Sequence, residues 1–226
     1  MCGRFSLSVS AQTLAKFFRL PEVPSFERRY NLTPTQSVAT VVVPQPGCDR
    51  QFQWMRWGLI PSWAKDPKIG NRMINARVET VAEKPAFRNA LKQRRCLVLA
   101  DGFYEWQQQG KQKQPYYFQV NQGEPFAFAG LWETWQSPED ERIVSCTLIT
   151  TVANDKVQPI HDRMPVILSP ESYDAWLDPS LKEPQAVLSL LVPEPVEKMK
   201  TYPVSQGVNN PSFDRPDCIQ PLAEKS

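Results

Sequence analysis

The sequence is poor in the residues that bind metal ions. His161 is the one histidine among 226 residues, and the five cysteines include no C-x-x-C pair. A structural zinc site needs several cysteines or histidines at short spacing, and a disulfide framework needs an even set of cysteines. The sequence therefore predicts no metal site, no disulfide framework and no cofactor.

Long apolar runs are also missing. No stretch of about 18 apolar residues occurs, and the N-terminus has neither the charged start nor the apolar centre of a signal peptide. Hydrophobic residues make up 41% and charged residues 22% of the chain, which is ordinary globular composition and argues against disorder. We expect a cytoplasmic protein with no membrane partner, and nothing in the sequence demands more than a monomer.

Glycine is scarce, whereas proline and tryptophan are plentiful. The chain has nine glycines, 22 prolines and seven tryptophans, which favours rigid turns between short strands. We predict one α+β domain over 1–226, mainly an antiparallel barrel-like sheet with peripheral helices, a core over about 2–205 and a polar C-terminal tail. Strands are predicted at 3–9, 38–43, 52–59, 96–100, 116–120, 126–131, 145–151, 166–168 and 200–204, and helices at 10–20, 86–95, 170–177 and 184–191, with 22–37 irregular.

The charges are unevenly distributed along the chain. Residues 1–100 hold 16 Lys and Arg against 6 Asp and Glu, whereas residues 101–226 hold 10 against 18. A basic face for a polyanion explains this asymmetry. Two oppositely charged halves of one fold, each neutralising the other, explain it equally well.

Cys2 is the first candidate nucleophile. If Met1 is removed, Cys2 carries a thiol with a pKa near 8.5 beside an α-amine with a pKa of about 7.7 to 8.0. A 1,2-aminothiol of this kind reacts with an aldehyde, first as an imine and then as a five-membered thiazolidine. The alternative is an incidental cysteine, because free cysteines are usually small buried hydrophobes.

Two titratable groups could move protons. His161 stands between a proline-rich turn and an apolar strand, where site residues are common, although a lone histidine is more often a structural hydrogen-bonding group. Glu105 lies among Phe103, Tyr104 and Trp106, where desolvation would raise its pKa and fit it for acid–base work. The alternative places Glu105 on the solvent face of a strand while its aromatic neighbours face inward.

Several residues suit a nucleic acid. Asn75 and Arg77 are two positions apart and share a face if that segment is extended, and an amide beside a guanidinium fits a sugar–phosphate backbone. Trp63 and the loop around Pro34 could stack on or wedge apart bases. Surface ion pairs for the arginines and core packing for most tryptophans are the alternatives.

Six motifs occur in order along nearly the whole chain, from Cys2 to about Pro203. They are Met1-Cys2-Gly3-Arg4-Phe5, Tyr30-Asn31, Trp57-Gly58-Leu59-Ile60-Pro61, Asn75-Ala76-Arg77-Val78-Glu79-Thr80, Asp101-Gly102-Phe103-Tyr104-Glu105-Trp106 and Ile160-His161-Asp162-Arg163-Met164-Pro165. Together they resemble the SRAP family, the SOS response-associated peptidase domain. Six motifs in sequence are far more specific than any one of them.

The resemblance implies a function in the DNA damage response. Proteins of this family capture abasic sites in single-stranded DNA, including single-strand/double-strand junctions, as a covalent thiazolidine crosslink. It implies Cys2 as nucleophile, Glu105 as acid and base, His161 as an aid to sugar ring opening and Asn75 as the residue that holds Cys2 and the lesion. The implied DNA contacts are Arg4, Arg77, Arg163, Trp106 and, with less support, Thr150, while Pro34 and the 57–72 loop, with Trp63, wedge the DNA.

The family name also implies a peptidase activity that removes Met1, with weak lyase action at abasic sites as a side reaction. Two other functions fit much of the same pattern. A cysteine hydrolase, either an N-terminal-nucleophile amidase or a protease, could use Cys2 with His161 and Glu105 or Asn75. A noncatalytic single-stranded DNA-binding module would make Cys2 incidental. The basic first half favours DNA over an amidase.

Overall fold

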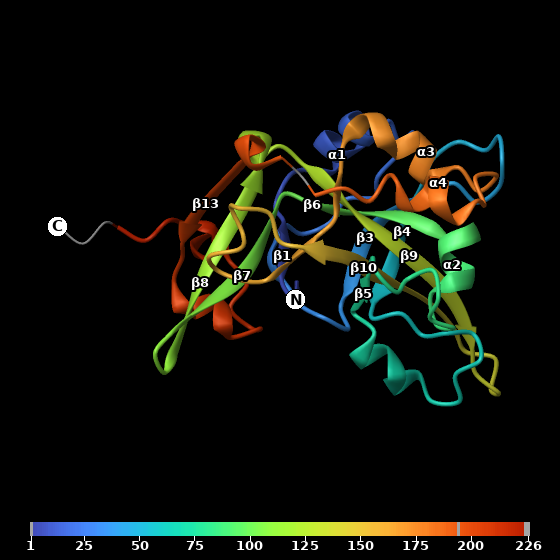
Figure 1. Cartoon of the computed structure of the whole chain (residues 1–226), viewed down its shortest axis with the longest axis horizontal. Helices are drawn as coiled ribbons and strands as arrows, with labels where there is room; N and C mark the ends of the chain where they lie inside the picture. The colour runs from blue at the N-terminus through green and yellow to red at the C-terminus, as the bar shows by residue number, and fades with distance from the viewer. Residues whose placement is uncertain (1, 194, 224–226) are drawn as a thin grey trace.

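Two β-sheets make up the fold of the computed structural model, which describes residues 2–193 and 195–223 (Figure 1). The first sheet has five strands in the order β13-β8-β7-β1-β2, all antiparallel to their neighbours. Its members are β1 (Phe5–Leu7), β2 (Arg29–Leu32), β7 (Gly102–Gln109), β8 (Gln112–Val120) and β13 (Met199–Pro203). The expected α+β fold, rich in antiparallel strands, is confirmed.

The second sheet closes into a barrel. Five strands follow one another around it, and the last pairs with the first, so that these strands leave no open edge. They are β10 (Arg142–Val152), β4 (Gln51–Trp57), β3 (Ser37–Val42), β6 (Arg95–Ala100) and β9 (Phe126–Gln136). Three short strands extend the sheet: β5 (Asn75–Arg77) and β11 (Arg163–Pro165) pair with β10, and β12 (Ile167–Leu168) pairs with β9. The β4–β10 and β5–β10 pairs are parallel.

The helices lie outside the barrel (Figure 1). They are α1 (Ala11–Phe18), α2 (Arg88–Gln93), α3 (Tyr173–Leu177) and α4 (Pro184–Leu188), with 3₁₀ turns η1 (Pro67–Arg72), η2 (Asn121–Gly123), η3 (Pro170–Ser172), η4 (Val196–Lys198), η5 (Gln206–Asn209) and η6 (Pro216–Ile219). Ser10 caps α1, because its side chain accepts a hydrogen bond from the Thr13 N–H. No helix in the described part of the chain is long and apolar enough to cross a membrane.

Strand β6 shows why the barrel core was readable from the sequence. Every residue of β6 is buried, as the apolar run 96–100 predicted. The Trp176 indole of α3 donates a hydrogen bond to the Cys96 carbonyl at 3.0 Å, so a helix packs against the strand. Coverage on both faces removes the polar alternation that a half-exposed strand would carry.

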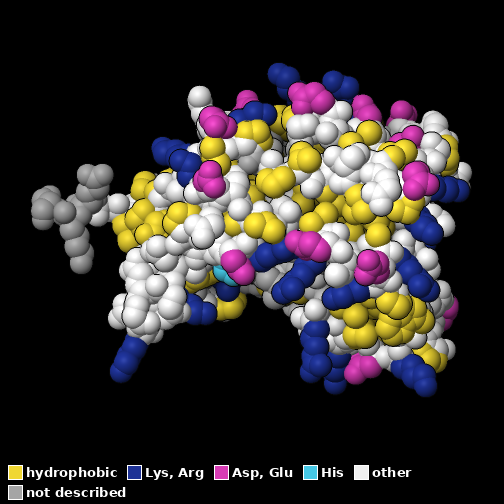
Figure 2. Space-filling view, viewed as in Figure 1, with side chains coloured by type: hydrophobic (Ala, Val, Ile, Leu, Met, Phe, Trp, Pro, Cys, Tyr) yellow, Lys and Arg dark blue, Asp and Glu magenta, His cyan; other side chains and the backbone are white. Residues whose placement is uncertain are grey.

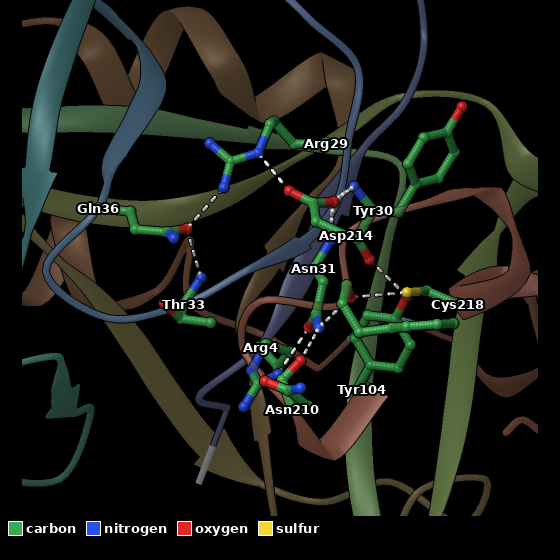
Figure 3. A network of polar contacts seen from close by, with 11 residues as sticks. Arg4, Arg29, Tyr30, Asn31, Thr33, Gln36, Tyr104, Asn210, Asp214 and Cys218 are labelled. Carbon is green, nitrogen blue, oxygen red and sulfur yellow. Dashed lines mark hydrogen bonds and ion pairs between the residues drawn. The ribbon is translucent and has the colours of Figure 1, made fainter. Parts of the chain in front are cut away.

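The segment 22–37, predicted as irregular, contains strand β2. Pairing with β1 forms it, with Phe5 opposite Leu32. Its outer edge is covered by Asp214, whose carboxylate accepts hydrogen bonds from the N–H groups of Tyr30 and Asn31 at 2.6 and 3.0 Å (Figure 3). A carboxylate that is 184 residues away in sequence therefore replaces the missing neighbouring strand.

The residues after 205, expected to be a polar tail, pack onto the five-stranded sheet as far as residue 222. Val208 and Cys218 are fully buried there beside Tyr104 and Tyr117. Phe213 and Ile219 pack against the same cluster, so four apolar residues of a largely polar stretch dock it. This C-terminal segment (205–222) contributes to the site described next.

Candidate active site

A cleft of about 410 Å³ lies beside the N-terminal strand and is lined by Arg4, Glu105, Trp106, Lys113, His161 and Asn209. Four of these residues are among the predicted site residues. Figure 2 shows a hollow at the lower edge of the molecule, with dark-blue Lys and Arg side chains around it and the histidine close by. The structure thus brings together residues from the two termini and from the middle of the chain.

Cys2, two residues before the cleft residue Arg4, is fully buried. The side-chain amide of Asn75 donates a hydrogen bond to the Cys2 carbonyl at 2.8 Å. Burial raises the pKa of the Cys2 thiol, and the charge of Glu105 raises it further, so the two side chains interact electrostatically. The structure therefore brings Cys2, Asn75 and Glu105 together.

Strand β1, which carries Cys2, is held by a buried carboxylate. Asp101 accepts hydrogen bonds from the Ser6 hydroxyl at 2.5 Å, from the Ser8 N–H and hydroxyl at 2.5 and 2.6 Å, and from the Val9 N–H at 3.0 Å. The Tyr117 hydroxyl lies 2.7 Å from that of Ser6. Because charged hydrogen bonds inside a protein are strong, this cluster fixes the strand that positions the nucleophile.

Glu105 is 2% exposed, so the alternative that placed it on a solvent face is wrong. Buried and exposed side chains do not alternate here, because both faces of β7 are covered. Tyr104, which points to the opposite face from Glu105, is also fully buried. Burial raises the pKa of Glu105 to about 7, and the nearby charge of Asp162 adds to the increase. A carboxyl group with this pKa exists in both protonation states at neutral pH, which suits acid–base chemistry.

His161 reaches the cleft from the loop before β11. Its Nδ1 lies 3.0 Å from the Arg163 N–H and 3.0 Å from an Asp162 carboxylate oxygen. The contact with the Arg163 N–H requires an unprotonated Nδ1 that accepts, whereas the contact with Asp162 requires a protonated Nδ1 that donates. Partial burial lowers the His161 pKa, which favours the neutral ring that accepts from Arg163, and its proton is then on Nε2.

Arg4 and Trp106 form one wall of the cleft. The Arg4 guanidinium lies 5.6 Å from the centre of the Trp106 ring, within cation–π range. Its Nη1 donates to the Asn31 side-chain oxygen at 2.7 Å and to the Val208 carbonyl at 2.6 Å (Figure 3 shows Arg4 beside Asn31). Arg4 is thus held by β2 and by the C-terminal segment.

Thr150 on β10 is opposite Arg77 on β5, and Arg163 on β11 is opposite Val152, two residues further along β10. Arg77 is exposed. Arg163 makes a bidentate ion pair with Glu79 and donates to the Thr150 carbonyl at 2.8 Å. Among the described residues Arg77 forms no ion pair, although its charge helps to lower the pKa of Glu79, whereas Arg163 is paired with Glu79 directly.

Pro34 and Trp63 do not line the cleft. Pro34 is half-buried in the turn between β2 and β3. Trp63 is 59% exposed and lines a second hollow with Lys65, Lys68 and Arg72. A basic loop with an exposed indole is compatible with the predicted wedge, and the wedge stays a prediction.

Lys113 and Asn209 are cleft residues that the sequence analysis missed. Lys113 lies in the β7–β8 hairpin, and Asn209 ends the η5 turn of the segment expected to be a tail. No local pattern marks either residue, because only the packing of that segment brings Asn209 to the cleft. Within residues 2–193 and 195–223, no three His, Cys, Asp or Glu side chains gather as a metal site would require.

The chain is similar to known proteins of one family. The profile of the family "SOS response associated peptidase (SRAP)" matches residues 1–211. The "Abasic site processing protein YoqW" of Bacillus subtilis (strain 168) is 43% identical over 225 residues, covering 97% of this chain and 99% of its own. The "Abasic site processing protein HMCES" of Gallus gallus is 37% identical over 198 residues, covering 77% of this chain and 58% of its own.

Solved structures agree as well. A crystal structure of a Bacteroides thetaiotaomicron protein superposes with a TM-score of 0.86 at 28% identity and covers 98% of this chain and 100% of its own. A Bordetella bronchiseptica protein gives a TM-score of 0.76 at 27% identity, covering 90% of this chain and 100% of its own. The predicted family resemblance is confirmed: the chain belongs to the SRAP family.

Proposed function

We propose that this protein processes abasic sites in single-stranded DNA by capturing them as a thiazolidine crosslink on Cys2 after removal of Met1. The observation that carries the proposal is the contact between Asn75 and the Cys2 carbonyl at 2.8 Å, together with the electrostatic interaction of Cys2 with Glu105, which lines the cleft with His161. The naming of the SRAP relatives in Bacillus subtilis and Gallus gallus as abasic site processing proteins supports it. The crosslink would shield the lesion until repair.

The chemistry balances without a cofactor. The ring-opened deoxyribose offers an aldehyde at C1′. The Cys2 amine adds to that carbon and one water leaves, forming an imine; the thiol sulfur then adds to the same carbon while its proton passes to nitrogen. The product keeps every other atom, so the adduct mass is that of protein plus DNA less one water.

Glu105 and His161 supply the proton transfers in this scheme. A Glu105 carboxyl with a pKa of about 7 can accept a proton from the amine and return it to the departing water. Neutral His161, with its proton on Nε2, can donate to the sugar ring oxygen as the ring opens. Running the same steps backward, Glu105 also assists reversal.

The arginines would bind the flanking backbone. Arg4 at the cleft and exposed Arg77 on β5 offer guanidinium groups to phosphates, and Trp106 offers an aromatic face. Thr150, opposite Arg77 in the sheet, and Arg163, which donates to the Thr150 carbonyl, would support it. The wedge function of Pro34 and Trp63 belongs to the same proposal.

Two further activities follow from the chemistry at Cys2. The same site would cleave the Met1–Cys2 peptide bond, which releases the amine that capture requires. An imine at C1′ also acidifies the C2′ hydrogens, so β-elimination and weak lyase action compete with ring closure.

Intact-protein mass spectrometry tests the proposal. The purified protein is measured alone and after mixing with a single-stranded oligonucleotide that carries one abasic site. We expect loss of Met1 and a heat-stable adduct at the summed mass less one water, mapped to Cys2. The same oligonucleotide with a tetrahydrofuran spacer, which has no aldehyde, must give no adduct.

Other outcomes identify the alternatives. Retained Met1 with no adduct would overturn the proposal in favour of a cysteine hydrolase or a binding module. Loss of Met1 with only a borohydride-trapped imine would mean a lyase. Salt-sensitive DNA binding that persists in Cys2→Ala, with no covalent product in the wild type, would identify a noncatalytic module.

A further inference from the structure

We propose that Lys113 and Asn209 form an outer phosphate subsite, which binds the phosphodiester of a nucleotide flanking the one that reacts at Cys2. This inference rests on the proposed function. Both residues line the cleft that holds Arg4, Glu105 and His161, and they reach it from the β7–β8 hairpin and the C-terminal segment. Neither is needed for the chemistry at Cys2.

The orientation of the Asn209 amide is determined by Trp106. The Trp106 indole N–H donates to the Asn209 side-chain oxygen at 2.6 Å. An indole nitrogen can only donate, so the atom facing it must be Oδ1 and the Asn209 NH₂ group points away from the indole. Asn209 is exposed and lines the cleft. Its two N–H donors are therefore available to an anionic oxygen.

The backbone around Asn209 is anchored from below. Val208 is fully buried, and its carbonyl accepts from Arg4 at 2.6 Å and from Asn31 at 3.2 Å. The Asn31 amide also donates to the carbonyls of Asn210 and Phe213 at 3.1 and 2.7 Å (Figure 3). The donor is thus presented by a turn with little freedom, which lowers the entropic cost of binding.

Lys113 supplies the charge. It is exposed and lies opposite Gln108 in the hairpin, two positions from the pair of Trp106 and Pro115. Since side chains two apart on a strand share a face, Lys113 lies on the Trp106 side of the sheet. Lys113 lines the same cleft as Asn209, so a cationic side chain and the Asn209 amide border one cavity.

The charge balance of the cleft favours an anion. Within the described residues, no carboxylate forms an ion pair with Arg4 or Lys113. Glu105 lines the same cleft, but its raised pKa of about 7 leaves much of that carboxyl neutral up to pH 7. An ammonium, a guanidinium and an oriented amide match a phosphodiester oxygen better than they match a base edge.

The test separates this subsite from the proposed function. Binding of an undamaged fluorescent single-stranded oligonucleotide is measured from 0.05 to about 0.5 M salt for the wild type, Lys113→Ala and Lys113→Arg. The matched control is Lys111→Ala, an exposed lysine of the same hairpin outside the cleft. We expect Lys113→Ala to flatten the slope of log K against log salt by about 0.7, Lys113→Arg to keep it, and the control to leave it unchanged.

Asn209→Asp tests the amide. The aspartate keeps an oxygen for the Trp106 indole but replaces the NH₂ donor with a negative charge, so we expect weaker DNA binding than in Asn209→Ala.

If the wild type forms the crosslink but Lys113→Ala binds DNA with the wild-type affinity and salt slope, the subsite is overturned and the proposed function stands. The subsite would also be overturned if Lys113→Ala and Lys111→Ala flattened the salt slope equally, because the change would then reflect only the net charge of the protein. If Lys113→Ala flattens the salt slope as expected but the wild type forms no adduct, the proposed function alone is overturned.

Discussion

The side-chain amide of Asn75 donates to the Cys2 carbonyl at 2.8 Å, and this bond links the barrel to the N-terminal strand. Asn75 begins β5, which pairs in parallel with β10 of the barrel, whereas Cys2 precedes β1 of the five-stranded sheet. The Asn75 side-chain oxygen is buried without a protein partner in the described part of the chain. That oxygen is the acceptor we assign to the amine or to the lesion.

Asn75→Ala should slow crosslinking about tenfold at saturating DNA. The substitution removes a hydrogen bond that orients Cys2, and a net value of about 1.4 kcal/mol corresponds to that factor. The measurement is the single-turnover rate on denaturing gels. A wild-type rate would show that Asn75 does not orient Cys2 for the reaction. A lowered thermal midpoint in the same variant would then show that Asn75 supports the fold.

Cys2→Ser should abolish the heat-stable adduct, because the oxygen counterpart of the ring, an oxazolidine, hydrolyses readily. The matched control is Cys48→Ser, which replaces the exposed free cysteine. The control should crosslink as the wild type does. Full crosslinking by Cys2→Ser would exclude a thiazolidine on Cys2.

Glu105→Gln should become more stable relative to the wild type as the pH rises. The folded-state pKa of about 7 exceeds the ordinary 4.5, so the folded protein binds the proton more tightly than the unfolded chain. Wild-type stability therefore falls from about pH 4.5 to pH 7 and stays lower above it, by on the order of 3 kcal/mol. Urea unfolding at pH 5 and pH 8.5 measures this.

The control for that experiment is Glu139→Gln, since Glu139 is exposed. Its stability difference from the wild type should be the same at both pH values. A Glu105→Gln difference that is also constant would mean that Glu105 has an ordinary pKa.

Asp101→Ala should destabilise the protein by about 3 kcal/mol, because it removes an acceptor of the buried Ser6 hydroxyl and of the partly buried Ser8 and Val9 N–H groups. Asp101→Asn should cost less, since the Ser6 hydroxyl can turn and accept from the new amide. Urea midpoints measure both. The control is Asp49→Ala at an exposed position, whose free energy of unfolding should lie within about 0.5 kcal/mol of the wild type. If Asp101→Ala changed stability no more than this control, the hydrogen bonds of Asp101 would contribute nothing to stability.

Arg77→Ala should weaken binding of single-stranded DNA and flatten its salt dependence by about 0.7 in slope. Arg77 is exposed and accessible to a phosphate. Arg19→Ala, which removes an exposed cation at the end of α1, is the control and should keep the slope. An unchanged slope in Arg77→Ala would mean that Arg77 contacts no phosphate.

Local pattern was enough for most elements of the barrel. The apolar run at 96–100 and the capped helix after Ser10 read correctly because burial and capping are decided by neighbours in sequence. Strand β2 could not be predicted from its own sequence, because it is formed by pairing with β1 and by the carboxylate of Asp214, which both come from elsewhere in the chain.

By itself the sequence determined the family, the main strands and the identity of Cys2, Asn75, Glu105 and His161 as chemically able side chains. Only the tertiary structure decided that Glu105 is buried with a pKa of about 7, that Arg163 is already paired with Glu79, and that Asn209 reaches the cleft. The physical reason is that side-chain chemistry is local, whereas desolvation and pairing depend on contacts between residues far apart in the chain.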